Sequence, residues 1–163
     1  MEIERKFKIK ELPKDIEKYE KKEIVQGYLC IKPTVRIRKE NDNYTLNYKW
    51  KNNKMTEQKA IQNIEYEMPL TKENYEHLLK KVDNNIIIKT RYKMPINENL
   101  TAEVDVFHGN LEGLIFAEVE FPNIEVAENF IKPSWLGEDV SFDKRYDNTL
   151  LSKIDEYNIK YFA

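Results

Sequence analysis

Cysteine, glycine and proline are scarce in this sequence, and each scarcity excludes a class of protein. The single cysteine, Cys30, can build neither a disulfide framework nor a multi-cysteine metal site within one chain. Four glycines and six prolines among 163 residues, together with 12% aromatic residues, are atypical of a disordered or low-complexity chain. The sequence therefore predicts an ordered domain.

Long apolar runs and a strong charge of one sign are also lacking. No apolar run approaches the roughly 18 residues of a membrane span, and the opening MEIERKFKIK has no apolar stretch typical of a signal peptide. The 27 basic residues nearly balance the 29 acidic ones, and a net charge of -2 argues against a nucleic-acid binder. We expect a soluble cytoplasmic protein with no membrane partner and no nucleic-acid partner.

The chain does have enough apolar material for one core. With 163 residues, of which 40% are hydrophobic, its size favours a single domain over 1–163. Period-two alternation of β-branched and aromatic residues dominates. It predicts strands over residues 2–9, 24–31, 34–40, 43–51, 62–68, 86–94, 100–107, 114–121 and 141–146. Helical spacing and capping residues predict helices over residues 15–23, 71–81, 123–131 and 148–157.

Many strands and a few short helices indicate an α+β fold. The segments 34–40 and 43–51 form the clearest hairpin, because the intervening Asn41 and Asp42 favour a turn. In so short a chain, closure of the sheet into a barrel is an economical way to remove its edges. We expect one antiparallel domain, closed into an eight-stranded β-barrel with short flanking helices.

Charges on alternate positions are the most prominent pattern in these strands. Alternate residues of a strand point to the same face about 7 Å apart, so like charges there repel one another. An antiparallel sheet with one solvated face would alternate in this way. A barrel whose charged face points inward would instead grip a polyanion and divalent cations. Both interpretations stay open for Glu2, Glu4 and Lys6; Arg36 and Arg38; Lys49 and Lys51; Glu65 and Glu67; Lys89 and Arg91; Glu103 and Asp105; Glu118 and Glu120.

The first of these sets forms a recognisable motif. Glu2-Ile3-Glu4-Arg5-Lys6 resembles the Glu-x-Glu-x-Lys signature of the CYTH superfamily, the triphosphate tunnel metalloenzymes. Further segments are similar to the successive strand motifs of that family, in the same order: VRIR, TLNYKWK, IEYEMP, KTRY, AEVDVFHGNLEG, AEVEF and DKRYDN. The resemblance implies an eight-stranded antiparallel tunnel that hydrolyses or cyclises a triphosphate-bearing substrate with Mg²⁺ or Mn²⁺.

The resemblance also implies roles for individual residues. The basic residues expected to contact phosphate oxygens are Lys6, Arg36, Arg38, Lys49, Lys89 and Arg91, together with Lys144 or, as its alternate, Arg145. The carboxylates expected to bind metal are Glu2, Glu4, Glu118, Glu120 and Asp105, supported by Glu65, Glu67 and Glu103. The residues expected to act in catalysis are Glu2, Glu4, Lys6 and Tyr28.

Within the superfamily, the short bacterial tripolyphosphatases are most similar in length and share the run Gln26-Gly27-Tyr28. Hydrolysis of inorganic tripolyphosphate is therefore the expected reaction, with a small-molecule triphosphate as the partner. Three alternatives stay open: a class IV adenylate cyclase, a thiamine triphosphatase, and a non-catalytic module that binds polyphosphate or nucleotide triphosphate. Tyr28 either gates or orients the substrate or simply packs. A homodimer through the outer apolar surface also stays open.

Overall fold

The computed structural model describes residues 1–51 and 59–162. The strands in this part of the chain are β1 (Glu2–Ile9), β2 (Glu20–Cys30), β3 (Thr34–Glu40), β4 (Asn43–Lys51), β5 (Ile61–Pro69), β6 (Asp83–Pro95), β7 (Thr101–His108), β8 (Ile115–Glu120) and β9 (Leu136–Asp139). The helices are α1 (Lys72–Leu79), α2 (Ile124–Glu128) and α3 (Asn148–Leu151). Short 3₁₀ turns lie at Ile16–Lys18, Gly109–Leu111, Lys144–Tyr146 and Ile159–Phe162. None of the described helices has both the length and the apolar character needed to cross a membrane.

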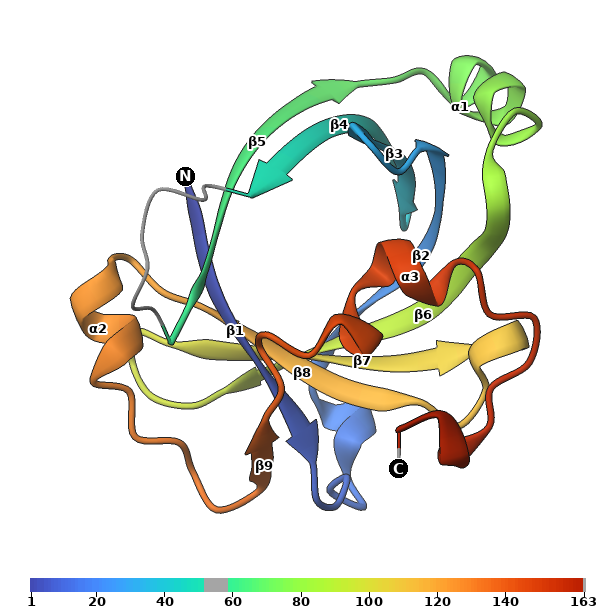
Figure 1. The fold of residues 1–163 in the computed structure, drawn as a ribbon. Helices are drawn as coiled ribbons and strands as arrows, with labels where there is room; N and C mark the ends of the chain where they lie inside the picture. Colours follow the sequence, from blue (N-terminus) through green and yellow to red (C-terminus); the bar gives the residue numbers. More distant parts are fainter. Residues whose placement is uncertain (52–58, 163) are drawn as a thin grey trace.

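Eight of the strands close into an antiparallel barrel in the order β1-β5-β4-β3-β2-β6-β7-β8, and β8 returns to β1 (Figure 1). The ring closes where Glu2 of β1 pairs with Asn63 of β5. On its other side, β1 pairs with β8 from Glu4 to Lys8. The ninth strand, β9, pairs with the second half of β1, beyond the end of β5. The expected eight-stranded barrel with short flanking helices is confirmed.

Apolar side chains pack on both sides of the barrel wall. Outward-facing residues such as Val104 of β7 and Val119 of β8 are fully buried in a cluster that includes residues of the loops and of α2. On the inward face, Phe107 and Phe116 belong to a second cluster with Leu151 of α3. Figure 1 shows α3 within the outline of the ring of strands. The C-terminal segment therefore fills part of the barrel interior, and the charged residues share the rest of it.

A turn and a helix cap form where the sequence predicted them. Asn41 adopts a φ of 52° in the turn between β3 and β4, a left-handed conformation that asparagine tolerates. Its backbone N–H donates to the Glu23 carbonyl at 2.9 Å, which fixes the hairpin against β2. The side chain of Thr71 caps α1 by accepting a hydrogen bond from the Asn74 backbone N–H at 3.0 Å.

Three predicted elements are wrong in type or length. Within the predicted helix 15–23, only Ile16–Lys18 forms a helical turn, because residues 20–23 pair with β6 and belong to β2. The predicted strand 141–146 is not a strand: β9 lies earlier in the chain, and Lys144–Tyr146 forms a 3₁₀ turn. The predicted helix 148–157 ends at Leu151. In the first case pairing with a distant strand overrides the local pattern. In the second case the Asp143 side chain caps a turn instead.

The outer face of β4 and β5 carries a group of exposed apolar side chains. Tyr48, Trp50 and Tyr66 pack in a row, with ring centroids 5.0 and 5.7 Å apart, and Met68 follows on the same strand. Tyr66 is the most exposed of them, at 62%. The homodimer expected through an outer apolar surface stays a prediction.

Candidate active site

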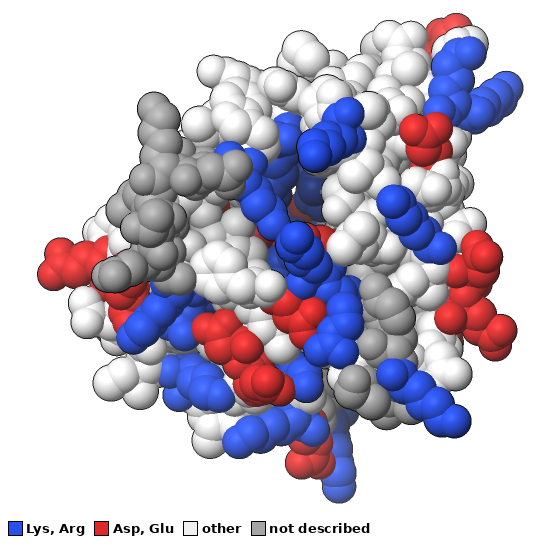
Figure 2. All heavy atoms as spheres, viewed as in Figure 1, with Lys and Arg blue, Asp and Glu red and all other residues white. Residues whose placement is uncertain are grey.

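The barrel interior holds a cavity of about 190 Å³ whose lining is mostly charged and polar. Figure 2 shows Lys and Arg side chains around a hollow in which acidic atoms are visible. The charged sets therefore point inward, and the interpretation as a solvated sheet face is wrong for them. The predicted site residues that line the cavity are Glu2, Glu4, Lys6, Tyr28, Arg36, Arg38, Lys49, Glu65, Lys89, Arg91, Glu118 and Glu120.

Opposite charges on neighbouring strands explain why like charges can share one strand. Lys49 of β4 lies directly opposite Glu65 of β5. Lys6 of β1 lies opposite Glu118 of β8. Facing residues in an antiparallel pair have Cβ atoms about 5 Å apart, closer than the about 7 Å between alternate residues of one strand. Attraction in these two pairs therefore offsets part of the repulsion along their strands, whereas Glu4 faces Glu120 and Glu103 faces Glu118.

The basic residues Lys6, Arg36, Arg38, Lys49, Lys89 and Arg91 form what we call the basic wall of the cavity. Asp105 is buried behind this wall. Its carboxylate accepts hydrogen bonds from Arg91 Nε at 2.7 Å and Arg91 Nη2 at 2.9 Å, and it lies 2.7 Å from Lys89 Nζ. Burial opposes ionisation, but the charges of Arg91 and Lys89 hold the pKa of Asp105 well below its usual range. Cations engage both oxygens, and Asp105 does not line the cavity. The structure thus places this expected metal ligand behind the basic side chains and in contact with them.

The cations of the lining are crowded and desolvated. Burial, followed by the nearby charges of Arg36 and Arg91, lowers the pKa of Arg38 to about 10. Burial also lowers the pKa of Lys89 to about 8, although Asp105 opposes that shift. An anion in the cavity would stabilise the charged form of each of these groups, so the basic wall favours an anionic ligand.

Three carboxylates gather on the opposite part of the lining. Oxygen atoms of Glu2, Glu4 and Glu120 all lie within 4.8 Å of one another. Burial and then the charge of Glu118 raise the pKa of Glu4 to about 8. Burial and then the charge of Glu2 raise the pKa of Glu120 to about 7. Because a cation would relieve this repulsion, and because carboxylate oxygens are the ligands that Mg²⁺ and Mn²⁺ prefer, the group fits a divalent metal.

Two neighbouring carboxylates are already paired with basic side chains. Glu2 lies 2.9 Å from Lys49 Nζ; burial opposes its ionisation, but the Lys49 charge and hydrogen bond lower the pKa of Glu2 to about 2. Glu118 lies 3.8 Å from Arg91 Nη2. Burial opposes ionisation there as well, while the charges of Lys6 and Arg91 lower the pKa of Glu118. Glu2 thus belongs to the group of three carboxylates and also contacts a basic side chain, Lys49.

Four other predicted site residues do not line the cavity. Lys144 is exposed, and Arg145 pairs with Asp143 in the 3₁₀ turn at 2.5 Å. The choice between Lys144 and Arg145 rested on strand alternation, which does not apply in a 3₁₀ turn. Glu103 pairs with Arg91 Nη1 at 2.8 Å, and the exposed Glu67 accepts a hydrogen bond from the Asn47 amide at 3.2 Å.

Tyr28 packs in the apolar interior and also lines the cavity. Its side chain belongs to the inward apolar cluster, and the residue is 3% exposed. Its packing role is therefore shown, while a role in gating or orienting a substrate stays a prediction.

Several residues of the lining were not predicted from the sequence. Asn47 and Asn63 alternate with charged residues already assigned to the inward face, so the same two-residue period could have identified them. Asp147 and Asn148 have no such signal, because the C-terminal segment brings them into the barrel from outside the strand pattern. Asp147 lies 3.4 Å from Lys6 Nζ and so occupies part of the basic wall.

Comparisons with known proteins agree with this geometry. No family model matches the chain. An inorganic triphosphatase of Nitrosomonas europaea is 33% identical over 155 residues, which span 93% of this chain and 96% of that protein. An inorganic triphosphatase of Acetivibrio thermocellus is 37% identical over 139 residues, which span 83% of each. The crystal structure of the inorganic triphosphatase NE1496 has a TM-score of 0.69 at 30% identity and covers 96% of this chain and 97% of that chain.

A closed antiparallel barrel with an inward charged face defines a triphosphate tunnel protein, the class that the strand motifs resemble. The two curated relatives show the family, because their sequences are 33% and 37% identical to this chain and the matches span 93% and 83% of it. This chain belongs to the family of inorganic triphosphatases.

Proposed function

We propose that this chain hydrolyses inorganic tripolyphosphate to pyrophosphate and phosphate inside its barrel, in a reaction that depends on Mg²⁺ or Mn²⁺. One observation carries the proposal: a wall of desolvated cations and a group of three carboxylates share the lining of one small cavity. A linear triphosphate needs cations for its own oxygens, and a metal ion needs carboxylate ligands. The names of the two curated relatives support the same substrate.

Glu2, Glu4 and Glu120 are the residues that would hold the metal. When bound, a divalent cation supplies charge neutralisation at phosphoryl oxygens and a lower pKa for bound water. Glu118 lies on the same face of β8 as Glu120, two residues away, and supports the group from the side of Lys6. Asp105 is left out of this ligand set, because Arg91 and Lys89 already engage its carboxylate.

The basic side chains bind and orient the phosphate chain. Arg36 and Arg38 supply guanidinium donors from β3, and the buried Arg36 Nε has no hydrogen-bond partner among the described residues. Their planar donor groups suit the oxygens of adjacent phosphates. The other cations assigned to phosphate are Lys6, Lys49, Lys89 and Arg91. Holding the chain in line with an attacking water and stabilising the spread charge are the main tasks in phosphoryl transfer, so no covalent nucleophile is required.

Tyr28 is assigned a positioning role at the same wall. It lies opposite Arg36 in the pairing of β2 with β3, and its side chain lines the cavity. Because Tyr28 is almost fully buried, it keeps its place and orients the substrate against the basic side chains.

The experiment is a panel of substrates. Phosphate release is measured from tripolyphosphate, thiamine triphosphate and ATP, each with Mg²⁺, Mn²⁺ or chelator, and cyclic AMP is assayed in the ATP samples. We expect metal-dependent release chiefly from tripolyphosphate. A preference for an organic triphosphate, or cyclic AMP formation, would replace the substrate, and intact substrate throughout would replace the enzyme by a binding module.

A further inference from the structure

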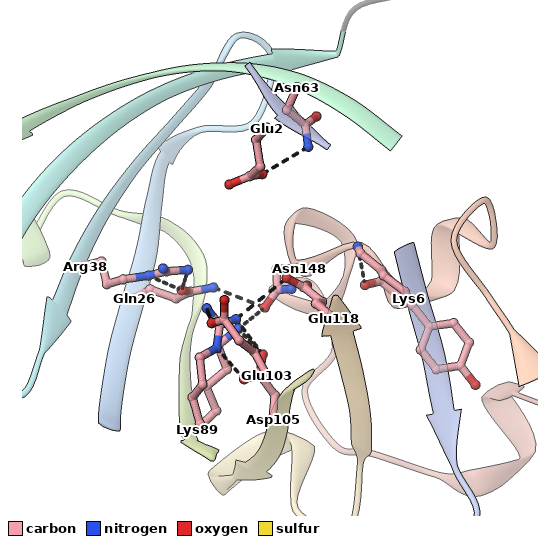
Figure 3. Close-up of polar contacts among 12 residues, drawn as sticks. Glu2, Lys6, Gln26, Arg38, Asn63, Lys89, Glu103, Asp105, Glu118 and Asn148 are labelled. Carbon is pink, nitrogen blue, oxygen red and sulfur yellow. Dashed lines mark hydrogen bonds and ion pairs between the residues drawn. The ribbon is translucent and has the colours of Figure 1, made fainter. Parts of the chain in front are cut away.

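Two neutral amide side chains form a bridge inside the charged barrel. Gln26 of β2 is fully buried, and its Oε1 accepts hydrogen bonds from Arg38 Nε at 2.9 Å and Arg38 Nη2 at 2.7 Å. Its Nε2 donates to Asn148 Oδ1 at 3.1 Å. The same Asn148 oxygen accepts from Lys89 Nζ at 3.2 Å. Figure 3 shows the four side chains converging from β2, β3, β6 and the start of α3.

This bridge differs from the partners of the other cations in the lining. Lys6, Arg36, Lys49, Lys51, Lys89 and Arg91 each have a carboxylate partner. Within residues 1–51 and 59–162, Arg38 has no carboxylate partner, and both of its hydrogen bonds go to the Gln26 amide oxygen. Arg38 is therefore fixed in direction by a neutral amide, without a carboxylate in direct contact with its guanidinium.

The difference between an amide partner and a carboxylate partner matters because the expected ligand is itself an anion. A carboxylate at Gln26 or Asn148 could hold the same cations, but it would also add a negative charge beside the bound phosphate chain. An amide oxygen carries only a partial charge, so it orients a cation and leaves the net charge for the ligand. The location of Asn148 adds a second consequence, because this residue connects the C-terminal segment to two strands of the barrel wall at once.

We propose that Gln26 and Asn148 are positioning residues for polyphosphate: their amides hold Arg38 and Lys89 against the cavity and add no negative charge beside the ligand. The inference rests on the proposed function, since it names two residues that serve the same site through other side chains. Neither amide carries a charge, so neither appears in the alternating charge pattern of the strands.

The test separates the charge of the bridge from its geometry. Asn148→Asp and Gln26→Glu keep the size of the side chain and its acceptor oxygen but add a negative charge. We expect each to weaken tripolyphosphate binding about tenfold or more, because a unit charge a few ångströms from a phosphate acts at low effective dielectric. Binding is measured by calorimetry in chelator, where no hydrolysis occurs. Unchanged affinity in both variants would overturn the claim that neutrality matters.

Asn148→Ala removes the acceptor without adding charge. Lys89 and Arg38 then keep their charges but lose the fixed geometry, so we expect kcat to fall at least tenfold while KM changes less than threefold. The matched control is Asn85→Ala. Asn85 also ties a barrel strand to the C-terminal segment, through the Ile154 carbonyl at 3.1 Å and Asp155 at 2.9 Å, but it does not line the cavity. Equal losses of kcat in both variants would reduce the role of Asn148 to anchoring the segment.

Failure of this inference can be told apart from failure of the proposed function. If the wild-type protein binds tripolyphosphate but releases no phosphate, the proposed hydrolysis is wrong, and the calorimetric comparison still tests the bridge. If the wild-type protein hydrolyses tripolyphosphate and the acidic variants match it in both affinity and rate, the hydrolysis stands and the bridge is wrong. Melting temperatures are recorded for all variants, and binding is compared below the lowest midpoint.

Discussion

Arg91 grips Asp105 inside the barrel wall with two parallel hydrogen bonds, from Nε at 2.7 Å and from Nη2 at 2.9 Å. The carboxylate is fully buried and also contacts Lys89. Since Asp105 is buried behind Lys89 and Arg91, which themselves line the cavity, it supports the site. It keeps these two cations charged and in place in a poorly solvated interior.

Replacing Asp105 should therefore cost stability. Asp105→Asn leaves Lys89 and Arg91 buried with one carboxylate fewer, and we expect the free energy of unfolding to fall by about 3 kcal/mol or more in chemical denaturation near neutral pH. The control is Asp15→Asn, whose pair with Lys18 is exposed and screened by water, so its loss should leave the free energy of unfolding nearly unchanged. Equal effects of the two substitutions would contradict the assigned role.

The same pair gives a pH dependence with a defined sign. The folded-state pKa of Asp105 lies below its unfolded value of about 3.9, so its contribution is fully present above that pH and is lost as the pH falls further. The stability difference between wild type and Asp105→Asn should therefore narrow below about pH 4. A difference that widens on acidification would contradict the lowered pKa.

Asp147 places a negative charge in the part of the cavity that we propose binds phosphate. Its carboxylate lies 3.4 Å from Lys6 Nζ and 3.4 Å from Lys51 Nζ. Asp147→Asn removes that charge with little change of shape, so we expect tripolyphosphate to bind several-fold more tightly in chelator, as measured by calorimetry. Asp155→Asn, an exposed change on the same segment, serves as the control. Weaker binding by Asp147→Asn would show that Asp147 chiefly holds Lys6 in position.

Metal binding should strengthen as the pH rises through the neutral range. The pKa of Glu4 is raised to about 8 and that of Glu120 to about 7, so both carboxyls carry a proton below pH 7 that a metal must displace. We expect the Kd for Mn²⁺, titrated without substrate, to decrease between about pH 6 and pH 9. A Kd that is constant over this range would contradict the assignment of these carboxylates as ligands.

The shared charged face could be predicted because a strand repeats every two residues. Once the segments around Arg36, Lys49 and Lys89 are strands, their alternating charges must lie on one face. The charge pattern alone left open whether that face points to solvent or inward; the resemblance to the tunnel family implied the inward direction, and the structure shows it. The sequence could not show that the Asp105 carboxylate would pair with Arg91, because that pairing depends on the register between β6 and β7.

The C-terminal part of the site was beyond the reach of local patterns. The family resemblance implied that Lys144 or Arg145 would enter the tunnel, and strand alternation allowed only one of them to do so. This segment instead forms a 3₁₀ turn that begins at a side-chain cap from Asp143. The turn redirects the chain so that Asp147 and Asn148 enter the cavity instead. Tertiary packing of the inward apolar cluster, which includes Leu151, determines that path.

The most direct test of the central claim is phosphate release from tripolyphosphate by wild type and Glu4→Gln, each with Mn²⁺ and with chelator. Glu4 belongs to the carboxylate group, and glutamine preserves its size while removing its charge. Glu73→Gln, an exposed change on α1, is the matched control. The account predicts metal-dependent release by wild type and by Glu73→Gln, and loss of release by a folded Glu4→Gln. Wild-type turnover by Glu4→Gln, or release by wild type that persists in chelator, would contradict it.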